Sequence, residues 1–310
     1  MKFVNKLKKL SCLEIIFFVL LITLIFIFLF KPKQEGFVEV KKEFIRKTGK
    51  DIFDDFYVDI YDDLVYNEKK NSFEIERIFK DNKSNPIVLD IGSGTGHHTE
   101  LISKIPNSTV IGIDNSPAMI KFSKQKNPEL DFRLASALDS MQFSPNSFSH
   151  ITCLYFTIYY IKNKQLLLEN CYKWLEPGGV LVLHLVNMYK FDPIVPIANP
   201  FVIVSPQSYT DKRITESKVK FDMLDYKSDF KLDESIPTNT CKIDKPNAIF
   251  KETFKFNNKK SRINEHNLYM SSQKSILALA RDIGFILQSQ EEMDGIQYEN
   301  NFLYTLVKPN

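Results

Sequence analysis

The chain has 310 residues, 44% of them hydrophobic, which is enough for one large α/β domain or two small ones. Its 41 basic and 38 acidic residues give a net charge of only +3 and are spread along the whole sequence, so we expect no nucleic-acid partner. The four cysteines, Cys12, Cys153, Cys171 and Cys241, show neither CxxC spacing nor a disulfide framework. This excludes the common zinc and redox motifs, so we expect no metal site and a reducing compartment.

A long apolar run lies near the N-terminus. Residues 15–30 are all apolar except Thr23, and the run extends back to Leu10 if the intervening glutamate lies near the interface. About 21 helical residues at ~1.5 Å each span roughly 31 Å, close to the ~30 Å hydrocarbon core of a bilayer. A signal peptide has a shorter apolar core and a small-residue cleavage site, and a buried helix shows periodicity. The pattern therefore predicts a single-pass membrane anchor over residues 1–31, followed by a juxtamembrane linker or a short surface helix over residues 32–50.

Beyond residue 50, strand-like and helix-like segments alternate. We expect strands within residues 86–94, 108–114, 130–134, 147–156 and 180–186, and helices at residues 99–105, after Ser116–Pro117 and at residues 164–175. Ser116 is a typical helix N-cap and Pro117 suits the first helical position. This alternation predicts a doubly wound α/β domain over residues 51–310, with a mostly parallel sheet covered on both faces.

Residues 187–270 break this alternation. They contain several prolines, and the segments 219–232 and 248–256 alternate polar and apolar residues with a period of two. We therefore predict a β-rich insertion after the fifth strand. A helix at residues 275–283, ended by Gly284, and strands at residues 285–290 and 302–307 complete the domain.

The loop after the first predicted strand is rich in glycine and reads DIGSGTG over residues 90–96. Glycines allow the backbone to turn sharply and to approach a ligand, and ligands of such sheets lie at the carboxyl ends of the strands. The dinucleotide motif GxGxxG would need glycine where His97 stands, so the third glycine comes one residue early. This spacing disfavours an NAD-dependent oxidoreductase.

Two carboxylates accompany the loop. Asp114 ends the second predicted strand, where a carboxylate can accept hydrogen bonds from both hydroxyls of a ribose. Asp90 precedes the glycines and is placed for an ammonium group, directly or through water. The pair indicates a ligand that is part nucleoside and part amino acid; the alternative is that both aspartates only cap the following helices.

At this point the sequence resembles a known family. The segments VLDIGSGTG, VIGIDNSPAMI, SFSHITCLYFTIYYI and WLEPGGVLVLHLV, in this order, are similar to the successive motifs of class I S-adenosylmethionine-dependent methyltransferases, in particular the small-molecule enzymes. The resemblance covers residues 51–186 and, in outline, the last helix and two strands. It implies a seven-stranded sheet whose final strand is antiparallel, the cofactor S-adenosyl-L-methionine, and methyl transfer by in-line displacement.

The resemblance also implies which residues contact the cofactor. The methionine part is expected over the glycine loop and the ribose at Asp114. Tyr61, in FYVDIYDDLVY, is expected to close over the sulfonium or the substrate, unless this helix only packs its aromatic rings on the sheet. Ser136 stands where many relatives carry an acidic residue for the adenine amino group, which puts cofactor affinity in doubt. The complete predicted set is Tyr61, Asp90, Gly92, Ser93, Gly94, Thr95, Gly96, Asp114, Asn115, Met119, Ser136, Ala137, Leu138 and Leu154.

The chemistry does not require a dedicated catalytic residue, because holding the nucleophile, methyl and sulfur in line supplies roughly 7–11 kcal/mol. A hydroxyl acceptor or an acidic carbon would benefit from a base. The candidates for a base, each of which a structural role also explains, are His97, His98, His184, Tyr159 and Tyr160. The segment after the fourth strand, residues 153–156, carries neither signature of the nucleic-acid methyltransferases.

Together these features predict a membrane-anchored S-adenosylmethionine-dependent methyltransferase that acts on a small-molecule or lipid-like acceptor covered by the 187–270 insertion. We expect the domain to face the cytoplasm, where the cofactor is made. A membrane-anchored protein methyltransferase and a non-catalytic S-adenosylmethionine-binding protein are the alternatives.

Overall fold

The computed structural model describes Val19, Leu21 and residues 44–80, 85–198 and 205–310. The chain divides into two units, Met1–Lys42 and Glu43–Asn310, and the description below concerns the second unit. In the described part of the chain, no helix is both long enough and apolar enough to cross a bilayer. The predicted membrane span lies outside the described residues, apart from Val19 and Leu21.

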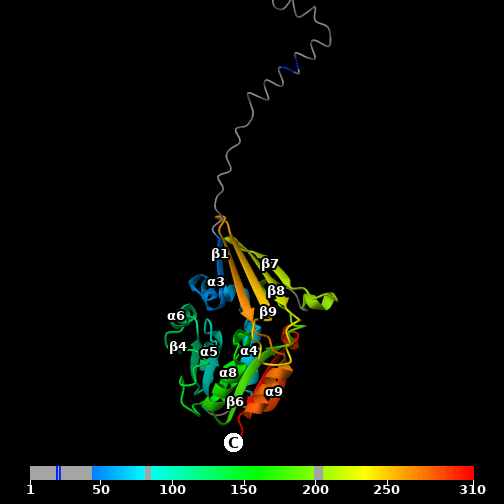
Figure 1. The fold of residues 1–310 in the computed structure, drawn as a ribbon. Coiled ribbons are helices and arrows are strands. Elements are labelled where there is room, and N and C mark those ends of the chain that lie inside the picture. Colours follow the sequence, from blue (N-terminus) through cyan, green and yellow to red (C-terminus); the bar gives the residue numbers. More distant parts are fainter. Residues whose placement is uncertain (1–18, 20, 22–43, 81–84, 199–204) are drawn as a thin grey trace, which may run out of the picture. The chain divides into compact units, whose positions relative to one another are not determined.

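A seven-stranded sheet forms the centre of the unit (Figure 1), with the strand order β11-β12-β6-β5-β2-β3-β4. The strands are β2 (Ile87–Ile91), β3 (Thr109–Asp114), β4 (Asp131–Leu134), β5 (Phe148–Cys153), β6 (Leu175–Val186), β11 (Ile286–Glu292) and β12 (Asn301–Val307). β2 pairs in parallel with β3 and β5, whereas β12 is antiparallel to both β6 and β11. This arrangement confirms the expected seven-stranded sheet with an antiparallel final strand.

Helices cover both faces of this sheet. They are α3 (Asp55–Val65), α4 (Glu68–Ile78), α5 (His97–Ser103), α6 (Pro117–Lys126), α7 (Thr157–Tyr160), α8 (Lys164–Trp174) and α9 (Gln273–Ile283), with short 3₁₀ turns at Gly49–Ile52, Pro196–Ala198, Pro206–Tyr209 and Asp294–Ile296. α6 begins where the sequence predicts: the Ser116 hydroxyl accepts a hydrogen bond from the Met119 backbone N–H at 3.1 Å. α9 ends at Gly284, whose φ of +122° suits a residue without a side chain.

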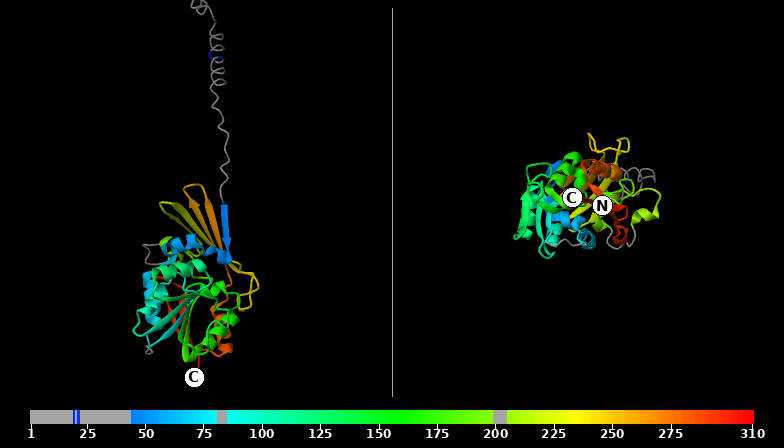
Figure 2. Two further views of the ribbon diagram at one scale, coloured as in Figure 1. Left: turned by 90° about the vertical axis from the view of Figure 1, so that its left-hand side faces the viewer. Right: turned by 90° about the horizontal axis from the view of Figure 1, so that it is seen from below.

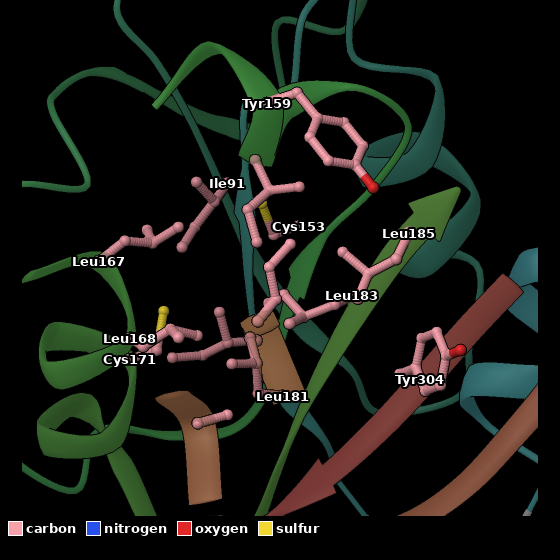
Figure 3. Close-up of a cluster of buried hydrophobic side chains, with 14 of the residues drawn as sticks. Ile91, Cys153, Tyr159, Leu167, Leu168, Cys171, Leu181, Leu183, Leu185 and Tyr304 are labelled. Carbon is pink, nitrogen blue, oxygen red and sulfur yellow. The ribbon is translucent and has the colours of Figure 1, made fainter. Parts of the chain in front are cut away.

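The central strands of the seven-stranded sheet contain continuous runs of apolar residues because both faces of this sheet are buried. On β6, Leu181, Leu183 and Leu185 belong to the core beneath α8 and α9, and Val182 between them belongs to the core beneath α4 and α5. Figure 3 shows these leucines with Leu168 and Cys171 of α8. Successive residues of a strand point to opposite faces, so a strand covered on both sides needs apolar residues at nearly every position.

A second sheet has five strands in the order β1-β10-β9-β8-β7. Four of them come from the predicted insertion: β7 (Glu216–Lys220), β8 (Leu224–Leu232), β9 (Ala248–Phe256) and β10 (Ser261–Leu268). They pair in antiparallel order, which agrees with the expected β-rich insertion. Views from two directions place this sheet at one end of the unit, next to α3 (Figures 1 and 2).

The edge strand β1 (Phe44–Thr48) departs from the sequence-based expectation. These residues lie in the segment 32–50, which was expected to be a linker or a surface helix. They instead pair in parallel with β10, from Phe44 opposite Ser261 to Thr48 opposite Glu265. The chain leading into the domain is therefore part of the second sheet.

Candidate active site

The glycine loop connects β2 to α5. The backbone N–H groups of Gly92 and Ser93 donate to the Ile113 carbonyl at 2.8 and 3.0 Å, which folds the loop back onto β3. Gly92, Gly94 and Gly96 all have positive φ, at +72°, +54° and +89°. A Cβ on Gly92 would lie 2.5 Å from the Thr157 side chain, and one on Gly96 would lie 2.7 Å from Phe132.

Gly94 differs from the other two glycines. A Cβ at this position would meet no atom within 4 Å, because Gly94 borders open space. The glycines at 92 and 96 are therefore required by packing, whereas Gly94 leaves room beside the loop.

Asp114 holds the loop from the end of β3. Its carboxylate accepts hydrogen bonds from the backbone N–H of Gly94 at 3.1 Å and of Ser116 at 2.8 Å. Burial raises its pKa above the ordinary aspartate value, although these backbone hydrogen bonds act in the opposite direction. Each carboxylate oxygen retains a lone pair that can accept a ribose hydroxyl.

Asp90 at the end of β2 is more deeply buried. Its two oxygens accept hydrogen bonds from the hydroxyls of Thr99, at 2.8 Å, and Thr152, at 2.9 Å. These bonds fix the carboxylate in one orientation beside the loop. An ammonium group can then use the remaining lone pairs.

The predicted cofactor residues surround one cavity of about 610 Å³, which is within the usual range for ligand sites. Only Gly96 of the predicted set does not line it, since Gly96 packs against Phe132. The thirteen others do: Tyr61, Asp90, Gly92, Ser93, Gly94, Thr95, Asp114, Asn115, Met119, Ser136, Ala137, Leu138 and Leu154. Among the described residues, the buried Ser93 hydroxyl finds no hydrogen-bond partner. An unpaired buried donor beside open space fits a ligand with a polar end, such as the carboxylate of an amino acid.

Asp62 connects α3 to the glycine loop through its side-chain hydrogen bonds. Its carboxylate accepts a hydrogen bond from the Thr95 hydroxyl at 2.6 Å and pairs with His97 Nε2 at 2.7 Å. Burial alone would raise the pKa of Asp62, but the hydrogen bonds from His97 and Thr95 outweigh it and leave the pKa below its ordinary value. This contact holds Tyr61, the preceding residue of α3, at the cavity wall.

The five-stranded sheet supplies another part of the cavity wall. Phe230 of β8, Phe250 of β9 and His266 of β10 line the same cavity as the glycine loop, as does Phe191 before the insertion. The insertion therefore contributes residues to the same cavity as the glycine loop.

The five candidate bases occupy different positions. His97, His98 and Tyr160 line the cavity. His184 is fully buried between Glu74, at 3.1 Å from Nδ1, and Asn301, at 3.0 Å from Nε2. The Tyr159 hydroxyl accepts the Val186 backbone N–H at 2.8 Å within the core. Neither His184 nor Tyr159 is among the residues that line the cavity, so both support the fold.

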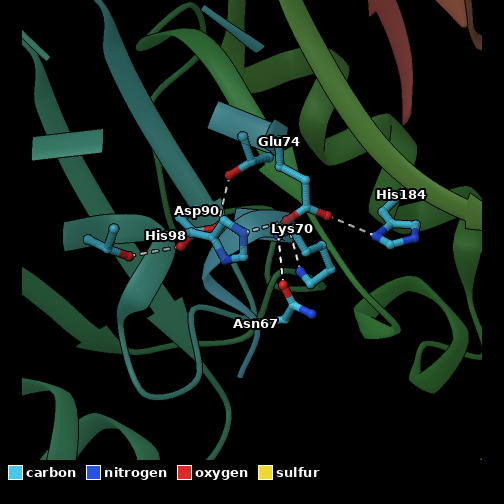
Figure 4. Close-up of polar contacts among 8 residues, drawn as sticks. Asn67, Lys70, Glu74, Asp90, His98 and His184 are labelled. Carbon is cyan, nitrogen blue, oxygen red and sulfur yellow. Dashed lines mark hydrogen bonds and ion pairs between the residues drawn. The ribbon is translucent and has the colours of Figure 1, made fainter. Parts of the chain in front are cut away.

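Sequence reasoning missed a buried charged cluster on α4. Lys70 donates to Glu74 at 2.8 Å, and the same carboxylate pairs with His98 Nε2 at 2.7 Å and with His184 (Figure 4). Burial alone would raise the pKa of Glu74, but the Lys70 charge and the two histidine hydrogen bonds hold it well below its usual range. Lys70 and Glu74 are four residues apart, yet α4 otherwise looks like an ordinary polar surface helix, so the spacing alone did not mark them.

A second group was also missed. His266 of β10 pairs with Glu252 of β9 at 2.7 Å and with the Tyr160 hydroxyl at 2.8 Å. Within the described ranges, no group of three or more histidine, cysteine, aspartate or glutamate side chains is arranged to hold a metal ion.

Comparison with known proteins also points to methyltransferases. Residues 88–179 match the family described as a methyltransferase domain. A trans-aconitate 2-methyltransferase from Methylobacterium radiotolerans is 31% identical over 100 residues, which are 32% of this chain and 37% of that protein. The match thus spans less than half the length of this curated relative.

Solved structures extend the likeness over most of the chain. An S-adenosylmethionine-dependent methyltransferase from Clostridium acetobutylicum has a TM-score of 0.60 at 16% identity and covers 82% of this chain and 98% of its own. The S-adenosylmethionine-bound amino pentose methyltransferase CalS10 from Micromonospora echinaspora has a TM-score of 0.53 at 17% identity and covers 77% and 90%. At these identities the likeness concerns the fold.

The sheet order and the glycine loop with Asp90 and Asp114 agree with the match of residues 88–179 to a methyltransferase domain. The fold is similar to that of solved S-adenosylmethionine-dependent methyltransferases.

Proposed function

We propose that this protein transfers a methyl group from S-adenosyl-L-methionine to a small-molecule acceptor enclosed between the glycine loop and the five-stranded sheet. The observation that carries the proposal is the shared cavity: the thirteen predicted cofactor residues line one wall, and aromatic residues of the insertion line another. When bound, the cofactor supplies a methyl group on a positively charged sulfur.

The residues of the loop would hold the cofactor. The Ser93 hydroxyl, which has no partner among the described residues, suits its carboxylate, and Asp90 suits its ammonium. Asp114 suits the two ribose hydroxyls. Tyr61, whose pKa burial raises far above the ordinary tyrosine value, stays a neutral phenol whose ring can face the sulfonium.

Enclosure of the cavity favours a small acceptor over a side chain on another protein. Phe191, Phe230 and Phe250 give the cavity an apolar lining on the side of the insertion. An enclosed site fixes the direction of attack, and orientation can supply roughly 7–11 kcal/mol of the barrier. The relatives compared above act on trans-aconitate and on an amino pentose, both small molecules.

We further propose that the apolar run at residues 15–30 anchors the protein in a membrane, with the domain in the cytoplasm, and that the acceptor is lipid-like or held near the membrane. The support for this is the sequence alone: the run is long enough for a bilayer and carries no charge. Alkaline carbonate extraction of cell membranes tests the anchor, which predicts that the chain stays in the pellet. Release of the intact chain into the supernatant would contradict it.

The acceptor can be sought with the full-length chain in detergent micelles. The protein is incubated with radiolabelled cofactor and with lipid or aqueous extracts, and the products are separated by thin-layer chromatography. Label in a lipid or a small metabolite supports the proposal. Label found only in protein would refute a small-molecule acceptor.

A further inference from the structure

Three side chains form a hydrogen-bonded row at the insertion side of the cavity. The Tyr160 hydroxyl lies 2.8 Å from His266 Nδ1, and His266 Nε2 lies 2.7 Å from a Glu252 carboxylate oxygen. Tyr160 ends α7, His266 belongs to β10 and Glu252 to β9, so the row joins α7 to the five-stranded sheet. Tyr160 and His266 line the cavity, whereas Glu252 lies behind them and is fully buried.

The partners of Glu252 fix the direction of these hydrogen bonds. The carboxylate also accepts from the Tyr226 hydroxyl at 2.9 Å and from the Asn264 amide at 3.2 Å. Burial alone would raise its pKa, but the nearby His266 and these hydrogen bonds keep the pKa below the ordinary glutamate value. A carboxylate only accepts hydrogen bonds, so the proton of a neutral His266 lies on Nε2. Nδ1 is then an acceptor, and the Tyr160 hydroxyl donates to it.

The surroundings of His266 are aromatic. The ring centroids of Phe53, Tyr57 and Phe250 lie 5.9, 5.7 and 5.6 Å from that of His266. Burial raises the pKa of Tyr57 and of Tyr160 well above the usual value, so both are neutral phenols. The His266 side chain itself is only 1% exposed, so solvent has little access to its imidazole.

We propose that His266 is the base that receives the proton of a hydroxyl acceptor, that Tyr160 relays this proton, and that Glu252 positions the imidazole. The inference rests on the proposed methyl transfer. A neutral amine attacks through its free lone pair, and a carboxylate is already ionised. An alcohol, a phenol or an acidic carbon instead needs to lose its proton as the new bond forms. Of these acceptors the row favours a hydroxyl compound, because an acceptor oxygen can hydrogen-bond to the Tyr160 hydroxyl at its cavity end.

The step balances as follows. The acceptor O–H bond breaks, and its proton passes to the Tyr160 oxygen while the Tyr160 proton passes to His266 Nδ1. An acceptor lone pair forms the new O–CH₃ bond, and the S–CH₃ bond breaks with its electrons remaining on sulfur. The positive charge of the resulting imidazolium is balanced by the Glu252 carboxylate. The imidazolium returns its proton to water after product release.

Nuclear magnetic resonance of the ¹⁵N-histidine-labelled, full-length chain in micelles, without cofactor, tests the row itself. We expect the neutral form of His266 to be the Nε2–H tautomer, assigned with His266→Gln. Tyr160→Phe should shift the Nδ1 resonance, and Glu265→Gln should not. Glu265 is the matched control because it lies on the opposite face of β10, paired with Arg46 at 2.6 Å. An Nδ1–H tautomer, or an Nδ1 resonance unmoved by Tyr160→Phe, would overturn the proposal.

The role of His266 as a base is tested by measuring turnover of the acceptor that the radiolabelled-cofactor experiment identifies. We expect His266→Gln to lower kcat by about 10²–10⁴-fold, the usual contribution of a general base. Glu252→Gln should lower kcat less, and Tyr160→Phe, which removes one oxygen only, provides a variant with little risk to folding. The dissociation constant for S-adenosylmethionine, measured by calorimetry, should stay within about twofold in all of them.

The possible failures can be told apart. Unchanged kcat in His266→Gln, or an acceptor that is an amine or a carboxylate, would refute the base but leave the methyl transfer intact. A wild-type chain that forms no S-adenosylhomocysteine with any acceptor would refute the proposed function and the base with it, whatever tautomer His266 adopts.

Discussion

The two glycines at the tip of the loop should respond differently to alanine. Gly92 and Gly94 both have positive φ, at +72° and +54°, so either alanine pays about 1–2 kcal/mol for a left-handed conformation. At Gly92 the new Cβ also lies 2.5 Å from Thr157 Cγ2 and Oγ1, which adds about 1–3 kcal/mol for overpacking. We therefore expect Gly92→Ala to lower the free energy of unfolding by about 2–5 kcal/mol and Gly94→Ala by about 1–2 kcal/mol.

Urea unfolding of the full-length chain, followed by circular dichroism, measures this difference. Thr157→Ala in the Gly92→Ala background should recover most of the excess, because it removes both atoms of the clash. Thr157→Ala in the Gly94→Ala background is the matched control and should recover nothing. Equal destabilisation by the two alanines would refute the packing role of Gly92.

The same pair of variants separates folding from cofactor binding. Gly94 lines the cavity, and its Cβ would enter open space. Gly94→Ala should therefore raise the dissociation constant for S-adenosylmethionine by about tenfold or more, equivalent to about 1.4 kcal/mol, despite its milder effect on stability. A dissociation constant equal to that of the wild type would contradict the position assigned to the cofactor.

Three further predictions concern charged residues. Asp62→Ala breaks the contacts of α3 with Thr95 and His97 and should weaken cofactor binding about tenfold. Glu74→Gln leaves Lys70 buried without a counter-charge and should cost about 3–5 kcal/mol of unfolding free energy at pH 7. Because the pKa of Glu74 is lowered in the fold, its stabilisation is present above the ordinary value of 4.5 and is lost as pH falls through the lower folded value. Burial lowers the pKa of Lys164 from 10.5 to about 8, so the unfolded chain binds the extra proton and stability should rise between those pH values, by about 3 kcal/mol at most.

Each of these three predictions can be measured against a matched control. Calorimetry compares Asp62→Ala with Asp63→Ala, whose side chain is exposed on the same helix. Urea unfolding at pH 7 and pH 3 compares Glu74→Gln with the exposed Glu76→Gln, and a penalty that does not shrink in acid would be inconsistent with the assigned pairing. For Lys164, the wild type should gain stability relative to Lys164→Met between pH 8 and pH 10.5; a constant difference would show that the amine titrates normally.

Much of the fold could be predicted because its main elements are specified locally. β2, β3 and residues 180–186 of β6 are mostly apolar, since both of their faces are buried. Ser116 marks a helix start through its side-chain hydroxyl, and Gly284 marks a helix end through its positive φ. The residues of the glycine loop are likewise contiguous in the sequence, and the two aspartates lie at the ends of neighbouring strands.

The remaining features depend on pairings between distant residues. The sequence FIRKT of β1 does not alternate polar and apolar residues, and it becomes a strand only because it pairs with β10 more than two hundred residues later. Glu252 and His266 meet because Glu252 lies opposite Asn264, two residues before His266 on the same face. Strand register in an insertion cannot be read from the period-two pattern, so neither residue was identified as part of the site.

The most direct test of methyl transfer is the formation of S-adenosylhomocysteine by the full-length chain. Purified protein in micelles is incubated with S-adenosylmethionine and a panel of small-molecule and lipid extracts, and the product is quantified by mass spectrometry against Asp114→Ala. A methyltransferase with the site described here forms S-adenosylhomocysteine in an acceptor-dependent manner, and Asp114→Ala reduces this to background. Tight binding of S-adenosylmethionine without any such product would contradict the enzymatic function and identify a non-catalytic cofactor-binding protein.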